Sequence, residues 1–241
     1  MVPPKGDPAV EAPVSLAEDL DRIEAAVAAG ETDLRGLGFW RVVARVKPDG
    51  ALVERHADQI GRIDTAAFRR AVKLRVPVWA GNTLLLLGVL VGGALVAAAV
   101  GTSSGTVAGL GLLGAAVVWS VSLHSPAHWV VGRAVGIRFT DYFLGGPPPP
   151  RPGLKTDYAT YLRTPPMRRA WMHASGAIAT KLAPFLALAF APAADAPWWA
   201  VAGLIALGFF QIATDVLFSV KTSDWKKVAR ERALAKTSAP G

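Results

Sequence analysis

The sequence predicts an α-helical integral membrane protein with four transmembrane helices, preceded by a small cytoplasmic α+β unit. The first observation is composition: 52% of the 241 residues are hydrophobic, only 18% are charged, and the mean hydropathy is +0.35. That balance is more apolar than a soluble domain normally shows. The second is the presence of long segments almost without charge, and the third is the gathering of Lys and Arg residues beside them.

The N-terminal region begins with a Pro-rich stretch of mixed charge, residues 1–14, which we expect to be disordered. It lacks the apolar core of a signal peptide. Ser15 and Glu18 have the spacing of a capping box, and apolar residues then recur at helical spacing up to Gly30, a typical helix stop. The sequence therefore predicts a first helix between Ser15 and Gly30.

After the first helix, the remaining residues up to 75 are expected to form a hairpin and a second helix. Two strand-like runs flank Pro48-Asp49-Gly50, a strong turn signal, and Asp64 or Thr65 can cap the helix that follows. His56 is expected to be an exposed surface histidine. The prediction for this part is a small α+β unit without a recognisable chemical motif.

Four apolar segments are long enough to cross the roughly 30 Å hydrocarbon core of a bilayer. Basic residues precede the first, fill the loop 132–169 and follow the fourth, whereas "GTSSGT" and "APAADAP" contain no Lys or Arg. The positive-inside rule then places both termini and the loop 132–169 in the cytoplasm, with the protein in the cell (inner) membrane. The predicted spans are about 76–100, 106–131, 170–191 and 197–220.

The loop and the C-terminal segment also show patterns. "GIRFTDYF" is strand-like, "GGPPPPRPG" is a stiff turn region, and "LKTDYATYL" favours a short helix. Residues 221–241 predict a basic helix capped by Ser223 or Asp224, with Trp225 as an interfacial anchor. The net charge of +8 is best explained by membrane topology and anionic lipid. The expected partner is therefore the lipid bilayer and not nucleic acid.

Ionisable residues within membrane spans are costly, so each one is a candidate functional group. From a rise of about 1.5 Å per residue, His124, His173 and Asp215 each lie about 27 Å from the outer face, and His128 lies one turn nearer the cytoplasm. Lys181 lies higher, at about 15 Å from that face. The predicted layer of polar groups near the cytoplasmic surface thus contains His124, His128, His173 and Asp215.

This layer predicts a metal site. His124 and His128 are four residues apart and share one helix face, and two imidazoles with one carboxylate suit zinc. The chain has no cysteine, so a transition-metal site must use His, Asp or Glu. The predicted ligands are His124, His128 and Asp215, with Gln211 supporting the carboxylate. A Lys181–Asp215 ion pair is a rival use of that aspartate, disfavoured by a height gap of about 12 Å, and ordinary interhelical hydrogen bonds are another explanation.

Three segments resemble the site-2 protease family of intramembrane zinc metalloproteases. "HSPAHWVVGRAVGIRF" looks like its His-Glu-x-x-His helix, "PPMRRAWMHASGAIATK" like the segment through its Gly-Pro-x-x-Asn helix, and "FFQIATDVLFS" like the helix that supplies the carboxylate ligand. The resemblance covers about residues 106–225. It implies a three-helix core around a zinc ion held by His124, His128 and Asp215 near the cytoplasmic side, and a membrane-protein substrate or partner.

The chain departs from the family at the catalytic position. Ser125 stands where the family has its glutamate, and a serine hydroxyl is not a general base at neutral pH. Pro126 follows and favours a kink. The remaining departures from the family's motifs are Ala177, Thr180 and Val216.

These departures leave three hypotheses for function. The first is a pseudoprotease that retains a divalent metal and binds or regulates a membrane partner. The second is a working zinc metalloprotease with an unorthodox base such as His173, which can instead be a fourth ligand; Asp141 and Asp157 are remote candidates for the base. The third is a metal-free scaffold subunit. Haem is disfavoured, because two histidines on one helix face cannot both be axial ligands of one haem.

Overall fold

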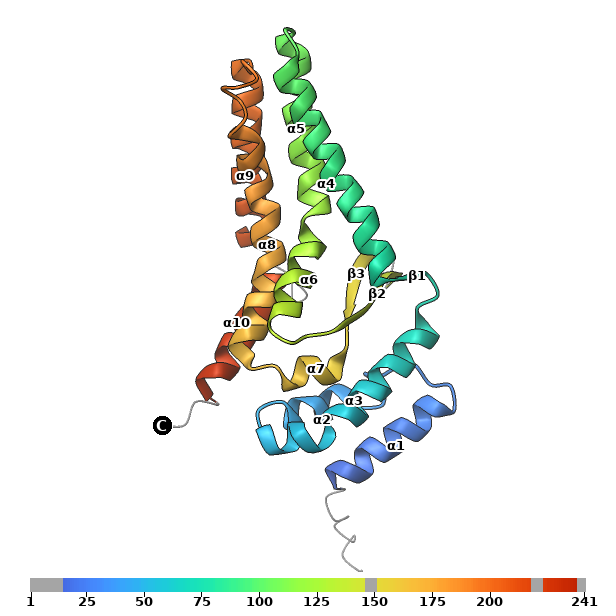
Figure 1. The fold of residues 1–241 in the computed structure, drawn as a ribbon. Coiled ribbons are helices and arrows are strands. Elements are labelled where there is room, and N and C mark those ends of the chain that lie inside the picture. Colours follow the sequence, from blue (N-terminus) through green and yellow to red (C-terminus); the bar gives the residue numbers. More distant parts are fainter. Residues whose placement is uncertain (1–14, 146–150, 218–222, 238–241) are drawn as a thin grey trace, which may run out of the picture. The chain divides into compact units, whose positions relative to one another are not determined.

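The computed structural model describes residues 15–145, 151–217 and 223–237, which form two compact units, residues 1–71 and 72–241 (Figure 1). The expected disordered tail, the centre of the Pro-rich turn and the last residues of the fourth predicted span lie outside the described residues. Each unit is described by itself below.

The first unit consists of three helices packed around one apolar core. Ser15 and Glu18 form the expected capping box, and Gly30 follows the end of the first helix with a φ of 117°. Leu20 and Ile23 of that helix, Phe39 of the second and Ile60 of the third are completely buried. The helices are α1 (Leu16–Ala28), α2 (Phe39–Val46) and α3 (Gly50–Ala71).

The predicted hairpin in this unit is wrong, and the unit is helical instead of α+β. The Asp49 carboxylate accepts hydrogen bonds from the backbone N–H groups of Ala51 and Leu52, at 2.8 and 3.1 Å, and so starts α3. Aspartate is common both at helix N-caps and in turns, because its carboxylate accepts hydrogen bonds from nearby backbone N–H groups in each. The Pro-Asp-Gly motif is therefore compatible with a turn and with a helix start. Asp64 and Thr65 lie inside α3 and do not cap a helix, and His56, on the same helix, is buried and not exposed.

Replacing Asp49 with alanine is expected to destabilise α3 by about 0.5–2 kcal/mol, because the first turn loses its capping acceptor. Amide hydrogen exchange along α3 in the full chain measures this as faster exchange. Asp49→Ser, which keeps a capping oxygen, should restore most of the protection. Equal exchange in the alanine variant and the wild type would contradict the capping role.

The second unit contains the long helices that run side by side in Figure 1. α4 packs on α5, α5 on α8, and α8 on both α9 and the C-terminal α10. The second predicted span is interrupted at Leu123, so α5 and α6 are separate helices. The helices of this unit are α4 (Val78–Gly101), α5 (Gly105–Ser122), α6 (His124–Ala134), α7 (Tyr158–Arg163), α8 (Pro166–Leu188), α9 (Trp198–Leu217) and α10 (Asp224–Thr237).

Among the described residues, three helices are long and apolar enough to cross a membrane: α4, α5 and α9. Leu84 and Leu90 on α4 and Phe209 and Phe210 on α9 are more than half exposed. A helix that presents large apolar side chains on its outer surface is typical of a membrane span. The third predicted span corresponds to α8, which has the length but contains His173 and Lys181 and is not one of these three.

Small residues allow the long helices to approach closely. Gly92 of α4 faces the indole ring of Trp119 on α5, and a Cβ atom there would overlap the ring. The Trp119 indole N–H donates to the Val89 carbonyl at 3.0 Å. Close backbone approach and interhelical hydrogen bonds are the usual means of packing helices in lipid.

A three-stranded antiparallel sheet lies beside the end of α4 that begins at Val78 (Figure 1). The Tyr142 hydroxyl donates to the Asn82 side-chain oxygen on α4 at 2.8 Å and fixes the middle strand there. The middle strand and α7 confirm the strand and short helix expected in the loop 132–169. In spatial order the strands are β1 (Arg75–Pro77), β2 (Phe139–Gly145) and β3 (Arg151–Thr156).

Candidate metal centre

The break between α5 and α6 places the two histidines at the start of a new helix. Pro126 has no N–H to continue the hydrogen bonds of α5, but it is tolerated in the first turn of α6, where backbone N–H groups have no intrahelical partner. His124 and His128 are then one turn apart, with ring centroids separated by 4.8 Å and ring planes perpendicular. Both rings face α8 and α10.

Each imidazole is oriented by a contact with α8 through its Nδ1 atom. His128 Nδ1 lies 2.6 Å from the Met172 carbonyl oxygen, and His124 Nδ1 lies 2.9 Å from the Thr180 hydroxyl. The same hydroxyl lies within hydrogen-bonding distance of the Gly176 and Ser120 carbonyl oxygens, at 3.1 and 3.4 Å. Gly176 also leaves room for the His128 ring, which a Cβ atom at this position would overlap.

Asp224, at the start of α10, completes the cluster. Its Oδ2 atom lies 3.2 Å from His128 Nε2 and 3.5 Å from His124 Nε2, while its Oδ1 atom accepts from Lys227 Nζ at 3.0 Å. Ser223 Oγ accepts from the Lys226 backbone N–H at 3.4 Å, so Ser223 contributes the cap and the Asp224 carboxylate turns toward the histidines.

The Asp224 carboxylate is ionised in this setting. Burial opposes its ionisation, but hydrogen bonds and charge from His128 and Lys227 outweigh that effect and hold the pKa of Asp224 well below its ordinary value. The carboxylate is therefore ready to bind a cation, whereas a protonated His128 ring must lose a proton before its Nε2 atom can do so.

The three side chains bring possible metal-ligand atoms close together. His124, His128 and Asp224 each offer one ligand atom, and these atoms all lie within 4.8 Å of one another. Zn–N and Zn–O bonds of about 2.0–2.2 Å put neighbouring ligand atoms about 3.3–3.5 Å apart, close to the two histidine–carboxylate separations. The Nδ1 contacts to a carbonyl and a hydroxyl are the usual outer partners of metal-binding histidines. This group could hold a metal ion.

A pocket of about 170 Å³ opens beside the cluster. His124, Ser125, His128 and Asp224 line one part of it, and His173 and Lys227 line another. The edge strand β3 contributes Pro152, Gly153, Leu154 and Thr156. A small molecule or a peptide segment in this pocket would lie next to the cluster.

His173 is connected to a buried polar network instead of the three ligand atoms. Its Nε2 atom lies 3.0 Å from the Tyr161 hydroxyl, which donates to Glu231 Oε1 at 2.7 Å. Glu231 also accepts from Arg169 Nε at 2.8 Å, and both members of that ion pair are almost fully buried. Burial and the Glu231 carboxylate raise the pKa of Tyr161 far above its ordinary value, so the hydroxyl keeps its proton.

The structure places Asp215 outside the cluster. Its carboxylate contacts Lys181 and accepts from the Trp225 indole N–H at 2.9 Å. The Lys181–Asp215 ion pair, which the expected height gap disfavoured, is present. Gln211 donates to Ser120 Oγ at 3.2 Å and contacts neither aspartate by a hydrogen bond in the described residues.

The loop carboxylates have local roles or lie away from the cluster. Asp157 caps α7 by accepting from the Thr160 N–H at 3.1 Å, and Asp141 lies in β2, paired with β1 and β3. The functional residue that sequence reasoning missed is Asp224, which is predicted only as a helix cap. The one sequence signal for a second role is Ser223, an alternative cap immediately before it.

The comparisons with known proteins leave the family open. No protein-family model matches the chain, and no curated protein and no solved structure is significantly similar to it. Function is therefore argued from the cluster and the pocket.

If the cluster holds zinc, replacing Gly176 with alanine is expected to lower zinc affinity by about 10–100-fold, because the added Cβ atom displaces the His128 ring from its contact with Met172. A competition titration with a zinc-chelating dye measures the effect. Gly114→Ala is the matched control, since a Cβ there meets only the end of the Leu95 side chain at 3.4 Å. Equal affinities of the two variants would contradict the role of Gly176.

Proposed function

We propose that this chain is a membrane protein that binds one zinc ion through His124, His128 and Asp224, and that it acts as a pseudoprotease related to the site-2 proteases. In this proposal it recognises or regulates a membrane-protein partner without cleaving it. The metal site is the part that the geometry supports best, and the absence of a catalytic glutamate supports the lack of proteolysis.

One observation carries the metal site. A carbonyl oxygen only accepts, so the His128 Nδ1 atom next to Met172 carries a proton. A neutral imidazole has one N–H, which leaves His128 Nε2 as a lone pair facing a carboxylate oxygen at 3.2 Å. Two acceptors at that distance repel each other unless a cation lies between them or the ring takes a second proton. His124 Nε2 lies 3.5 Å from the same carboxylate oxygen.

The proposed topology has four spans with both termini in the cytoplasm of the cell membrane. α8 is a span in this proposal, the third along the chain, because Trp171, Leu182 and Leu186 on it expose large apolar surface. Its polar groups face other helices: Lys181 pairs with Asp215 of α9, and Thr180 contacts His124 of α6. Charged residues that are paired inside a bundle are compatible with a span.

The proposed pseudoenzyme character comes from the residues around the pocket. A bound zinc ion would supply Lewis acidity, but hydrolysis also needs a positioned general base. Asp224 is the one carboxylate among the lining residues of this pocket, and in the proposal it is a ligand. Ser125 lies at the family's base position and cannot accept a proton at neutral pH.

A working hydrolase is the second candidate, and the position of His173 favours it. His173 lines the pocket, and its Nε2–H donates to a Tyr161 oxygen whose own proton goes to Glu231. The Nδ1 atom of His173 is then the acceptor nitrogen, as a base requires. This candidate predicts that His173→Ala abolishes cleavage and leaves zinc content unchanged.

The test combines metal analysis with a cleavage assay on the purified full chain. We expect about one zinc per chain in the wild type, near zero in His124→Ala and His128→Ala, and no cleavage of model transmembrane substrates. Cleavage that disappears in His173→Ala would replace the pseudoprotease by the hydrolase. Absence of stoichiometric metal in the wild type would leave a metal-free scaffold, in which an imidazolium pairs with Asp224.

A further inference from the structure

We infer that the groove between α8 and α10 is a binding site for one anionic phospholipid of the cytoplasmic leaflet. The groove has a volume of about 460 Å³ and lies outside the metal cluster. Its walls are almost entirely apolar, with two tryptophans and one cation. The lining residues are Met167, Ala170, Trp171, Ala174, Ile178, Trp225, Val228 and Arg232.

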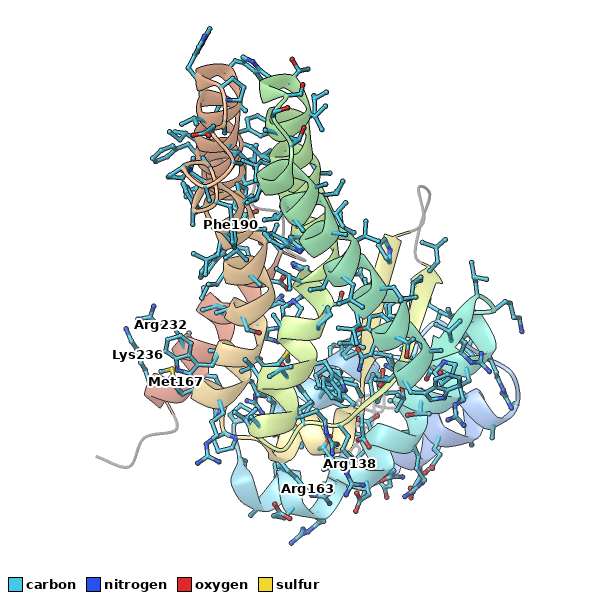
Figure 2. The ribbon with its side chains drawn as sticks, turned by 45° about the horizontal axis from the view of Figure 1, so that its top comes forward. Arg138, Arg163, Met167, Phe190, Arg232 and Lys236 are labelled. Carbon is cyan, nitrogen blue, oxygen red and sulfur yellow. The ribbon has the colours of Figure 1, made fainter. Side chains whose placement is uncertain are left out.

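The polarity of the groove matches that of a phospholipid. Arg232 and Lys236 of α10 lie together beside Met167, at the end where α8 begins (Figure 2). Trp225, at the other end of the groove, bonds to Asp215, which also contacts Lys181 further along α8. The cationic end is thus next to the basic loop, the apolar wall extends along α8, and the Lys181–Asp215 ion pair lies beside Trp225 at the other end.

The groove extends from the basic loop into the predicted span. From Met167 to Ile178 the rise along α8 is about 16 Å, and the predicted span begins at about residue 170, so the apolar wall of the groove lies at the cytoplasmic end of that span. Trp171 is 61% exposed and Trp225 is 36% exposed, and tryptophan is the residue that favours the depth just below the headgroups. An acyl chain along Trp171 and Ile178 would place its headgroup near Arg232.

The charge on α10 favours an anion over a zwitterion. Both acids of this helix are directed inward, Asp224 to Lys227 and the histidines, and Glu231 to Arg169. The outward side chains of Arg232 and Lys236 are exposed and basic. Each cation near an anionic headgroup contributes on the order of fivefold in affinity, and this inference holds whether or not the chain binds zinc.

The experiment is a lipid titration of the purified full chain in detergent, read by native mass spectrometry. The probes are phosphatidylglycerol and phosphatidylcholine with the same acyl chains. We expect one tightly retained phosphatidylglycerol in the wild type, an affinity about fivefold lower in Arg232→Gln and on the order of 30-fold lower in Arg232→Glu. Arg138→Glu is the matched control: Arg138 is exposed and lies away from the groove (Figure 2), and its variant should bind as the wild type does.

Equal loss in the Arg232→Glu and Arg138→Glu variants would overturn the site, as would equal retention of the two lipids by the wild type. A photo-crosslinker at position 178, placed in the full chain in phosphatidylglycerol vesicles, tests the occupant directly. Labelling of lipid is the expected result. Capture of a second copy of the chain would assign the groove to a protein interface instead.

Discussion

Asp224→Asn is expected to lower zinc affinity by on the order of 100-fold, whereas Asp215→Asn leaves it within about threefold. The amide in the first variant removes the anionic oxygen that lies 3.2 and 3.5 Å from the two histidines. In the second, the lost carboxylate contacts only Lys181 and Trp225 in the described structure. The measurement is a competition titration with a chelating dye on both purified proteins.

This pair of variants separates two ligand sets. The resemblance to site-2 proteases implies Asp215, and the geometry of the cluster favours Asp224. A large loss in Asp215→Asn together with a normal Asp224→Asn variant would mean that the helices rearrange around the metal. Equal losses in both would show that the affinity depends on the general position of α10 and not on one carboxylate.

Glu231→Ala is expected to lower the free energy of unfolding by about 3–5 kcal/mol, because it leaves the Arg169 guanidinium buried without its counter-charge. Arg169 and Glu231 are 1% and 3% exposed, and their bond links α10 to α8. The Tyr161 hydroxyl loses its acceptor in the same variant. Reversible unfolding in mixed detergent micelles, followed by circular dichroism, measures the change.

Two further variants show whether the effect comes from the charge pair. Arg230→Ala removes an exposed cation one residue away and should change stability by no more than about 0.5 kcal/mol. Glu231→Gln keeps the shape and much of the hydrogen bonding of the side chain, so its free energy of unfolding should lie between those of Glu231→Ala and Arg230→Ala. A Glu231→Ala variant as stable as Arg230→Ala would show that the buried network contributes nothing to the attachment of α10.

Local signals in the sequence predicted much of the fold. The capping box at Ser15, three of the four apolar spans and the strand that follows Gly136 depend on neighbours in the chain, and the described residues have these features. The Pro48-Asp49-Gly50 motif led to a wrong prediction of a hairpin, because the sequence does not distinguish an aspartate that starts a turn from one that caps a helix. Only the packing of α3 against α1 and α2 decides between them.

The candidate site could be predicted only in part. The spacing of His124 and His128 indicated a metal site, since two residues on one helix are related by helix geometry alone. The carboxylate comes from another element, and depth counted along straight helices favoured Asp215. The long Lys181 side chain reaches that aspartate, so the Asp215 carboxylate is paired with the Lys181 ammonium and not with the histidines. Asp224 lies beside the histidines because α10 packs on α8, and no sequence pattern near Asp224 predicts that packing.

In the proposed site, His124, His128 and Asp224 hold one divalent metal ion. X-ray absorption at the zinc edge, on the full chain loaded with one equivalent of zinc, identifies the ligands of that ion. We expect two imidazole nitrogens and carboxylate oxygen at about 2.0–2.2 Å, with the imidazole signal lost in a His124→Ala, His128→Ala double variant. Zinc surrounded only by oxygen in the wild type, or an unchanged spectrum in the double variant, would contradict it.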